Sequence, residues 1–112
     1  MTHEMKLQEV PFKMIKKGIK TIEMRLYDEK RKSISIGDSI HFTNVVTGEV
    51  LQARVINLHI FKTFDDLYET FEKSKLGYEE DEIANPEDMK QYYSDDEIEK
   101  YGVVGIEIVV NQ

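Results

Sequence analysis

The 112-residue sequence contains no cysteine and no tryptophan, and it has only two prolines. The absence of cysteine excludes disulfide bridges, thiolate zinc sites and cysteine nucleophiles together. No apolar run approaches the roughly 20 residues that a membrane-spanning helix needs, and residues 1–10 lack the apolar core of a signal peptide. We therefore expect a cytoplasmic protein that makes no membrane contact. Its length suits a single domain over residues 1–112.

The 22 acidic residues outnumber the 15 lysines and arginines, and the net charge of −7 argues against nucleic-acid binding through bulk electrostatics. The charges are distributed unevenly, however. Residues 13–32 contain eight basic residues against three acids, whereas residues 64–99 contain fourteen acids against three lysines. This separation is typical of one electropositive surface on an acidic body, although lysine-rich helix faces are often merely solvated.

The pattern of apolar residues predicts an α+β protein. Short helices are expected over residues 11–17, from the cap at 63 to the glycine at 77, and from the capping box at 94 to the glycine at 102. Strands are expected over residues 6–9, 19–26, 39–43, 49–61 and 103–110. The apolar positions of the longest strand change face at Val55-Ile56, which predicts a bulge. The connections favour a small, mostly antiparallel, barrel-like sheet with two to three short helices.

Residues 18–26 carry the most informative pattern. Strict alternation places Thr21, Glu23 and Arg25 on one face of a strand, and apolar side chains on the face that a core requires. Lys20 would fall on the apolar side by parity, so we expect the chain to turn just before it and free its side chain. From spacing alone, the acid and the base are either an ion pair that fixes a strand edge or the polar lining of a ligand site.

The order Gly-x-Lys-x-x-Glu-x-Arg after a short helix resembles the signature of the ASCH domain family. Asp28, Lys30 and Arg31, followed by Gly-Asp-x-Ile-x-Phe over residues 37–42, resemble the family's basic loop and its following strand. Residues 101–106, Tyr-Gly-Val-Val-Gly-Ile, resemble the closing strand of bacterial members. The resemblance spans nearly the whole chain. It implies a PUA-like β-barrel with a cleft between the barrel and its helices.

The same resemblance implies that Lys20, Glu23 and Arg25, which match the family's cleft residues one for one, line a site for RNA or for a nucleoside or nucleotide. An arginine fork suits a phosphate or the edge of a nucleobase. Lys30 and Arg31, on the loop after the strand, could follow a phosphate backbone.

Thr21 and Tyr93 complete the predicted ligand site. Thr21 shares the strand face of the acid and the base, and the Tyr93 ring could stack on a base, although such tyrosines more often cover the edge of a core. No metal is expected, because His41 and His59 lie on two strands of a hairpin without metal-ligand spacing. No cofactor is expected either, since the sequence contains no Walker loop and no dinucleotide fingerprint.

Two alternative functions remain open. Some small bacterial ASCH proteins are amidohydrolases that deacetylate N4-acetylcytidine with a lysine, a threonine and a later glutamate. Lys20 matches that lysine, but Glu23 stands at the threonine position. Glu69 and Glu72 are candidates for the later glutamate. In a hydrolase acting on a modified nucleoside or RNA, Lys20 and Glu23 would act as an acid–base pair. A protein-interaction domain would instead use the acidic helices, including residues 95–99.

Overall fold

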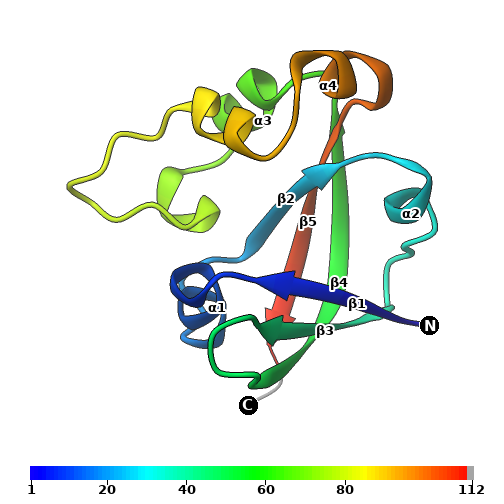
Figure 1. Cartoon of the computed structure of the whole chain (residues 1–112), viewed down its shortest axis with the longest axis vertical. Coiled ribbons are helices and arrows are strands. Elements are labelled where there is room, and N and C mark those ends of the chain that lie inside the picture. Colours follow the sequence, from blue (N-terminus) through cyan, green and yellow to red (C-terminus); the bar gives the residue numbers. More distant parts are fainter. Residues whose placement is uncertain (111–112) are drawn as a thin grey trace.

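The computed structural model describes residues 1–110 and contains one curled five-stranded sheet with short helices packed against it (Figure 1). The strands are β1 (Thr2–Leu7), β2 (Ile22–Leu26), β3 (Ser39–Asn44), β4 (Val50–Phe61) and β5 (Val103–Val110). The helices are α1 (Glu9–Lys16), α2 (Glu29–Lys32), α3 (Phe64–Thr70) and α4 (Asp95–Tyr101), together with the 3-10 helices η1 (Lys73–Leu76) and η2 (Pro86–Gln91). No helix among these 110 residues is long and apolar enough to cross a membrane.

The strand order is β1-β3-β4-β5-β2, so β5 lies between β4 and β2. β1 pairs with β3 in parallel, and the other neighbouring pairs are antiparallel. This arrangement confirms the predicted α+β class and the mostly antiparallel sheet. The pairing of β4 with β5 shifts its register between Val55 and Asn57, which confirms the predicted bulge.

β1 begins earlier than predicted because its partner strand, rather than its own apolar pattern, sets its length. Each residue from Thr2 to Leu7 has a partner in β3. His3 adds a side-chain contact, since its Nε2 lies 2.8 Å from Oδ2 of Asp38. Asp38 also accepts a hydrogen bond from the amide of Ser35, and these bonds lower the pKa of its carboxyl to about 2. The start of the chain is thus fixed beside the start of β3.

Two segments differ in secondary structure from the prediction. The helix expected from residue 63 to 77 begins as predicted at the Thr63 cap, which accepts from the amide of Asp66. The backbone becomes extended at Phe71, however, and η1 then leads separately to Gly77. The segment expected to be a charged loop after β2 contains α2, which begins at the Asp28 cap.

Two apolar clusters lie on opposite faces of β2 and β5. The first packs α1 against the inner face of the sheet through Phe12, Ile15 and Phe42. The second lies beneath α3, η1, η2 and α4, with Leu67 and Met24 among its buried members. Both faces of β2 are therefore covered, and a polar residue on either face is drawn into the interior.

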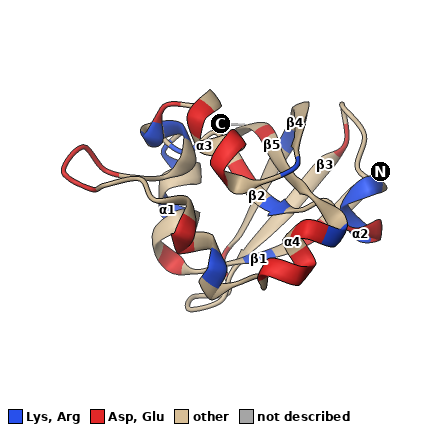
Figure 2. Cartoon of the chain, turned by 90° about the horizontal axis from the view of Figure 1, so that it is seen from above, with Lys and Arg blue, Asp and Glu red and all other residues tan. Residues whose placement is uncertain are grey.

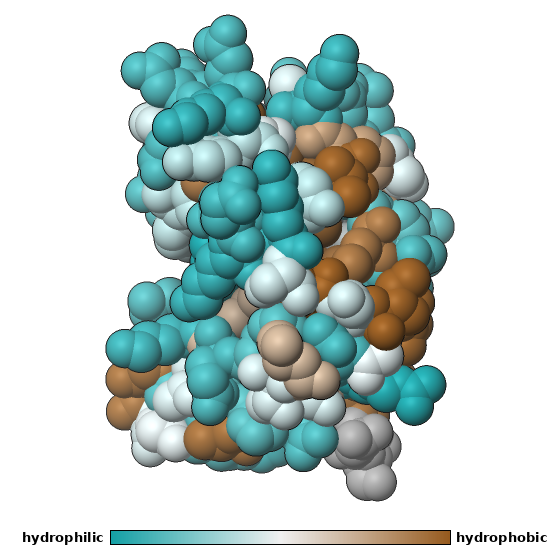
Figure 3. Space-filling view, turned by 90° about the vertical axis from the view of Figure 1, so that its right-hand side faces the viewer, coloured by the Kyte–Doolittle hydropathy of each residue, from teal (hydrophilic) through white to brown (hydrophobic). Residues whose placement is uncertain are grey.

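The second half of β4 has a strand partner on one side only within the described residues. β3 pairs with β4 as far as Arg54. Beyond the bulge, the amide of Leu58 donates to Oδ1 of Asn57 at 2.9 Å. Ile56 and Ile60 are exposed here, and hydrophobic residues reach the surface on this side of the molecule (Figure 3).

Candidate functional site

Three of the predicted site residues form one buried ionic group. Nζ of Lys20 lies 3.0 Å from Oε1 of Glu23, and Nε of Arg25 donates to Oε2 of Glu23 at 2.7 Å. The side chains of Lys20, Glu23 and Arg25 are 9%, 5% and 16% exposed. Two cations therefore share one carboxylate where water has little access.

The pairing of β2 with β5 explains the position of this group. Glu23 lies opposite Ile106 and Arg25 lies opposite Val104, and both partners belong to the first apolar cluster. Directly opposed residues share a face of a sheet, so the acid and the base point toward the side of α1. The alternate residues, such as Met24, face the second cluster. The predicted alternation is thus confirmed, but the polar face of the strand is buried instead of solvated.

A turn after α1 carries Lys20 to Glu23. The amides of Ile19 and Lys20 both donate to the carbonyl of Met14, so β2 begins at Ile22 and not at residue 19. This is the turn that the sequence led us to expect before the lysine.

Gly77 lies against the stem of Lys20. Its φ is +100°, and a Cβ built there would lie 3.0 Å from Cδ of Lys20. A glycine at this position therefore permits the left-handed backbone that ends η1, and it leaves room for the lysine stem.

Replacing Gly77 with alanine is expected to destabilise the protein more than the same change at Gly18. Both glycines follow a helix and have positive φ, +100° and +79°, so either alanine is strained. Only at Gly77 does the new methyl group meet Lys20, whereas nothing lies within 4 Å at Gly18. Urea unfolding should give a loss about 1 kcal/mol larger for Gly77→Ala. Equal losses would mean that the lysine stem moves aside without cost.

The two cations control the charge of Glu23. Burial by itself raises the pKa of this carboxyl, but the charges of Lys20 and Arg25 and the hydrogen bonds that they donate outweigh burial and lower the pKa below its ordinary value. Burial likewise lowers the pKa of the Arg25 guanidinium, but Glu23 outweighs this effect and the net pKa is raised. Glu23 is consequently a carboxylate at neutral pH and a weak proton acceptor.

The ionic group lines one wall of a cavity of about 400 Å³. The end of β1 and the start of α1 contribute to the same wall, with Lys6, Gln8 and Pro11. Residues 68–93 contribute the rest of the lining, and their polar or aromatic members are Tyr68, Tyr78, Glu82, Asp88, Gln91, Tyr92 and Tyr93. Cavities that bind small molecules have volumes of roughly 300–1,000 Å³, so one nucleoside-sized ligand suits this space.

The cavity lies where the two edge strands of the sheet, β1 and β2, come together. No strand ladder joins β1 to β2 within residues 1–110. Instead, Nη2 of Arg25 donates to the carbonyl of Lys6 at 3.0 Å. One arginine thus binds the carboxylate in the cavity and bridges the seam of the curled sheet.

Tyr93 also lines the cavity. Its ring stacks on Phe64 with 6.1 Å between the ring centroids. Burial raises the pKa of the Tyr93 hydroxyl despite the nearby positive charges of Arg25 and Arg31. A neutral aromatic side chain therefore lies beside the arginine of the ionic group.

The other predicted ligand-binding residues lie outside the lining of this cavity. Thr21 is held by its backbone, since its amide donates to the carbonyl of Lys75. Arg31 donates from Nη1 to Asp28 at 2.8 Å, and Lys30 is exposed on α2.

The two candidates for a later catalytic glutamate, Glu69 and Glu72, are exposed and do not line the cavity. The acids that do line it besides Glu23 are Glu82 and Asp88. Lys73 shapes this part of the lining, because its Nζ donates to the carbonyls of Glu80 and Glu82 at 2.7 and 2.6 Å. The sequence shows residues 78–88 only as an acidic connection, and the rings and acids of this part carry no periodic signal that would have placed them.

The distribution of charge around the sheet is visible in Figure 2. Basic residues lie on β1 and β2 near the middle of this view, whereas acids gather on α4 and on the long loop before η2. The cavity is lined by Lys6 and Arg25 from these strands and by Glu82 and Asp88 from the acidic connecting segment.

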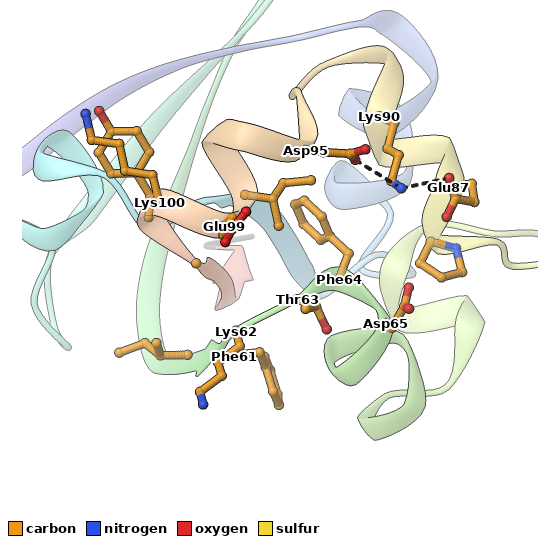
Figure 4. Close-up of a pocket in the computed structure, with 15 residues that line it drawn as sticks. Phe61, Lys62, Thr63, Phe64, Asp65, Glu87, Lys90, Asp95, Glu99 and Lys100 are labelled. Atoms are coloured by element: carbon orange, nitrogen blue, oxygen red, sulfur yellow. Dashed lines mark ion pairs between the residues drawn. The ribbon is translucent and has the colours of Figure 1, made fainter.

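A second and larger cavity, of about 760 Å³, lies between the end of β4, the start of α3, and α4 (Figure 4). Phe61, Phe64 and Ile98 are among its apolar lining residues, and the charged residues that line it are exposed. Nζ of Lys90 lies 3.1 Å from Glu87 and 3.0 Å from Asp95, so its charge is already matched. None of the predicted ligand-binding residues lines this cavity, and we place the candidate site in the smaller one.

The two strand histidines lie far apart along β4 and its partners. His41 is paired with Gln52, whereas His59 is paired with Gly105. Each contacts its own acid, and His59 is 2.8 Å from Glu107. Across residues 1–110, no three His, Cys, Asp or Glu side chains are grouped in a way that could hold a metal ion.

The curled sheet, its seam and the cleft beside the short helices define a PUA-like half-barrel. A family model described as the ASCH domain matches residues 5–111. The chain therefore belongs to the ASCH domain family, and the resemblance drawn from the residue motifs is confirmed. No curated protein matches the chain.

Three solved structures are similar to the chain. The crystal structure of the hypothetical protein PH0355 has a TM-score of 0.84 and 35% identity, over 99% of this chain and 100% of that chain. The solution structure of PF0455 from Pyrococcus furiosus has a TM-score of 0.73 and 35% identity, over 100% of this chain and 99% of that chain. A serine-to-alanine mutant of ZmASCH from Zymomonas mobilis has a TM-score of 0.64 and 12% identity, over 99% of this chain and 68% of that chain. This last likeness shows a shared fold.

Proposed function

We propose that this ASCH domain binds RNA, or a single nucleoside or nucleotide, in the cavity lined by Lys20, Glu23 and Arg25. The observation that carries the proposal is the buried ionic group in the wall of a cavity of about 400 Å³. Buried ion pairs contribute little net stability compared with apolar packing. Charged groups of this kind in a concave site are characteristic of ligand recognition.

The unused donors of the ionic group suit the acceptors of a nucleotide. An ammonium has three N–H donors, and Lys20 directs one of them to Glu23. A guanidinium has five, and Arg25 uses its Nε on Glu23 and one on the carbonyl of Lys6. The remaining donors can bind phosphate oxygens or the acceptor edge of a base. Tyr92 and Tyr93 supply rings on which a base can stack.

The charges of the cavity favour one nucleotide unit over a long RNA track. Three cations and three carboxylates line it, namely Lys6, Lys20, Arg25, Glu23, Glu82 and Asp88. Such a balance gives little general attraction for polyanions, in agreement with the net charge of −7. Recognition then depends on how a base fits the cavity.

The state of Glu23 favours binding over acid–base catalysis. Both of its oxygens accept from cations, and its pKa is lowered. A carboxylate in this condition is a poor general base at neutral pH. Glu69 and Glu72, the candidates for a second catalytic acid, lie outside the cavity lining.

Replacing Lys20 with methionine is expected to weaken ligand binding at least about tenfold, which is the loss of one hydrogen bond from a charged donor. Calorimetric titration with cytidine, cytidine monophosphate and a short single-stranded RNA measures this effect. Lys17→Met is the matched control, because Lys17 is an exposed lysine at the end of α1. Thermal unfolding establishes that both variants are folded.

Two results would contradict the proposal. In the first, the wild-type protein binds none of these ligands. In the second, Lys20→Met binds them as tightly as Lys17→Met. Parallel incubation with N4-acetylcytidine tests the hydrolase alternative, since turnover that disappears in Lys20→Met would establish an enzyme instead of a recognition module.

A further inference from the structure

The lining of the same cavity also contains two tyrosine hydroxyl groups in a hydrogen-bonded chain that ends on a carboxylate. The hydroxyl oxygens of Tyr68 and Tyr78 lie 2.8 Å apart. The hydroxyl of Tyr78 donates to Oδ2 of Asp88 at 2.8 Å. All three residues line the cavity.

The direction of this chain follows from the number of protons available. Burial raises the pKa of both Tyr68 and Tyr78, so each hydroxyl keeps one proton at neutral pH. The carboxylate of Asp88 can only accept, and so can the carbonyl of Asn85, which lies 3.4 Å from the Tyr78 hydroxyl. The Tyr78 hydroxyl therefore donates its proton to one of these acceptors and has none left for Tyr68. The bond between the two tyrosines must then be donated by Tyr68.

Both hydroxyl protons are donated within the hydrogen-bonded chain. The two hydroxyl groups and the carboxylate therefore offer only hydrogen-bond acceptors to the cavity. Tyr68 keeps the lone pairs of its oxygen, and Asp88 keeps an oxygen beside the one that binds Tyr78. Glu82 adds another carboxylate to the lining, with Oε1 accepting from the amide of Glu79 at 2.7 Å. The cations of the ionic group have the opposite character, since Lys20 and Arg25 offer only donors.

We infer that Asp88 determines specificity by accepting a hydrogen bond from an N–H group on the edge of the bound base. The inference rests on the proposed function and concerns the same cavity. A ligand that satisfies both sets of groups carries donors as well as acceptors, as amino-bearing nucleobases do. Tyr78 and Tyr92 line the cavity together with Asp88, so a stacking surface and the carboxylate are available to the same ligand.

The test compares ligands that differ in N–H donors. Cytidine is titrated against N4,N4-dimethylcytidine, and adenosine against N6,N6-dimethyladenosine. The wild-type protein is expected to prefer the amino form of at least one pair by about tenfold or more, the loss expected for a hydrogen bond to a charged acceptor. In Asp88→Asn this preference should fall to near unity, because the amide can present its own N–H groups to the cavity.

Glu87→Gln is the matched control. Glu87 precedes Asp88 in η2 and undergoes the same change of charge, but it lines the larger cavity. This variant should keep the wild-type preference. Thermal unfolding midpoints verify that the variants are folded.

The possible failures are distinguishable. Equal binding of the amino and dimethylamino forms by the wild-type protein overturns the inference and leaves the proposed function intact. A preference that survives in Asp88→Asn also overturns it, because the dimethyl group would then act through its bulk. The wild-type protein binding none of the four nucleosides overturns the inference, and the RNA and nucleotide titrations then decide the proposed function.

Discussion

Replacing Glu23 with glutamine is expected to lower the free energy of unfolding by about 3 kcal/mol or more, the cost of leaving a buried charge without its partner. The substitution preserves the shape of the side chain, but it leaves Lys20 and Arg25 facing each other without the carboxylate that both contact. Urea unfolding at neutral pH, followed by circular dichroism, measures the loss. Lys20→Met is the matched comparison and should cost less, because Glu23 then keeps its bond to Arg25.

The stability difference between the wild-type protein and Glu23→Gln is also expected to depend on pH. The folded-state pKa of Glu23 lies below its ordinary value of 4.5. Its stabilising contribution is therefore complete above pH 4.5 and is lost as the pH falls from there through the folded-state value. The difference in stability between wild type and Glu23→Gln should shrink over that range. A difference that stays constant on acidification would contradict the assignment of a charged, paired Glu23.

Replacing Arg25 with methionine is expected to cost about 2–4 kcal/mol and to loosen the seam between β1 and β2. The arginine donates to Glu23 and to the carbonyl of Lys6, and a hydrogen bond from a charged group contributes about 1.5–3 kcal/mol. Urea unfolding gives the total loss. Amide hydrogen exchange locates it, since exchange in β1 should accelerate more than exchange in the β3–β4 hairpin.

Arg25→Lys separates the two roles of the arginine. A lysine retains the positive charge beside Glu23, but a single ammonium cannot reproduce a planar fork that reaches two partners. This variant should recover part of the stability while β1 still exchanges quickly. Unchanged protection of β1 in Arg25→Met would show that the seam is held by other contacts.

Features with local causes could be predicted from the sequence. Ser94 and Glu97 form the expected capping box at the start of α4, because that motif involves residues three positions apart. The bulge near Val55 follows from a change of face within a single strand. Strand parity places Glu23 and Arg25 together, and family resemblance with the expected turn adds Lys20; the structure brings all three together in the lining of one cavity.

Features with distant causes could not be predicted. The length of β1 depends on β3, and Thr2 is paired with Ser39, which is remote in the sequence. The burial of Glu23 depends on what packs against its own face of the strand, where its partner Ile106 belongs to the first apolar cluster. The acceptor groups of the cavity come from polar and aromatic residues such as Tyr78 and Asp88, whose spacing follows neither a helical nor a strand period. Only the folded chain shows that they face the cavity.

The central position of β5 has a consequence for the order of events during synthesis. β2 and β4 flank this strand, yet both leave the ribosome before it. Until residues 103–110 emerge, β2 has no strand partner. The second half of β4 has none either, because β5 is its only strand partner among the described residues. The nascent chain can form the β3–β4 hairpin, but it cannot join β2 to the sheet. Completion of the sheet therefore waits for β5, and the site on β2 is assembled only after residues 103–110 have left the ribosome.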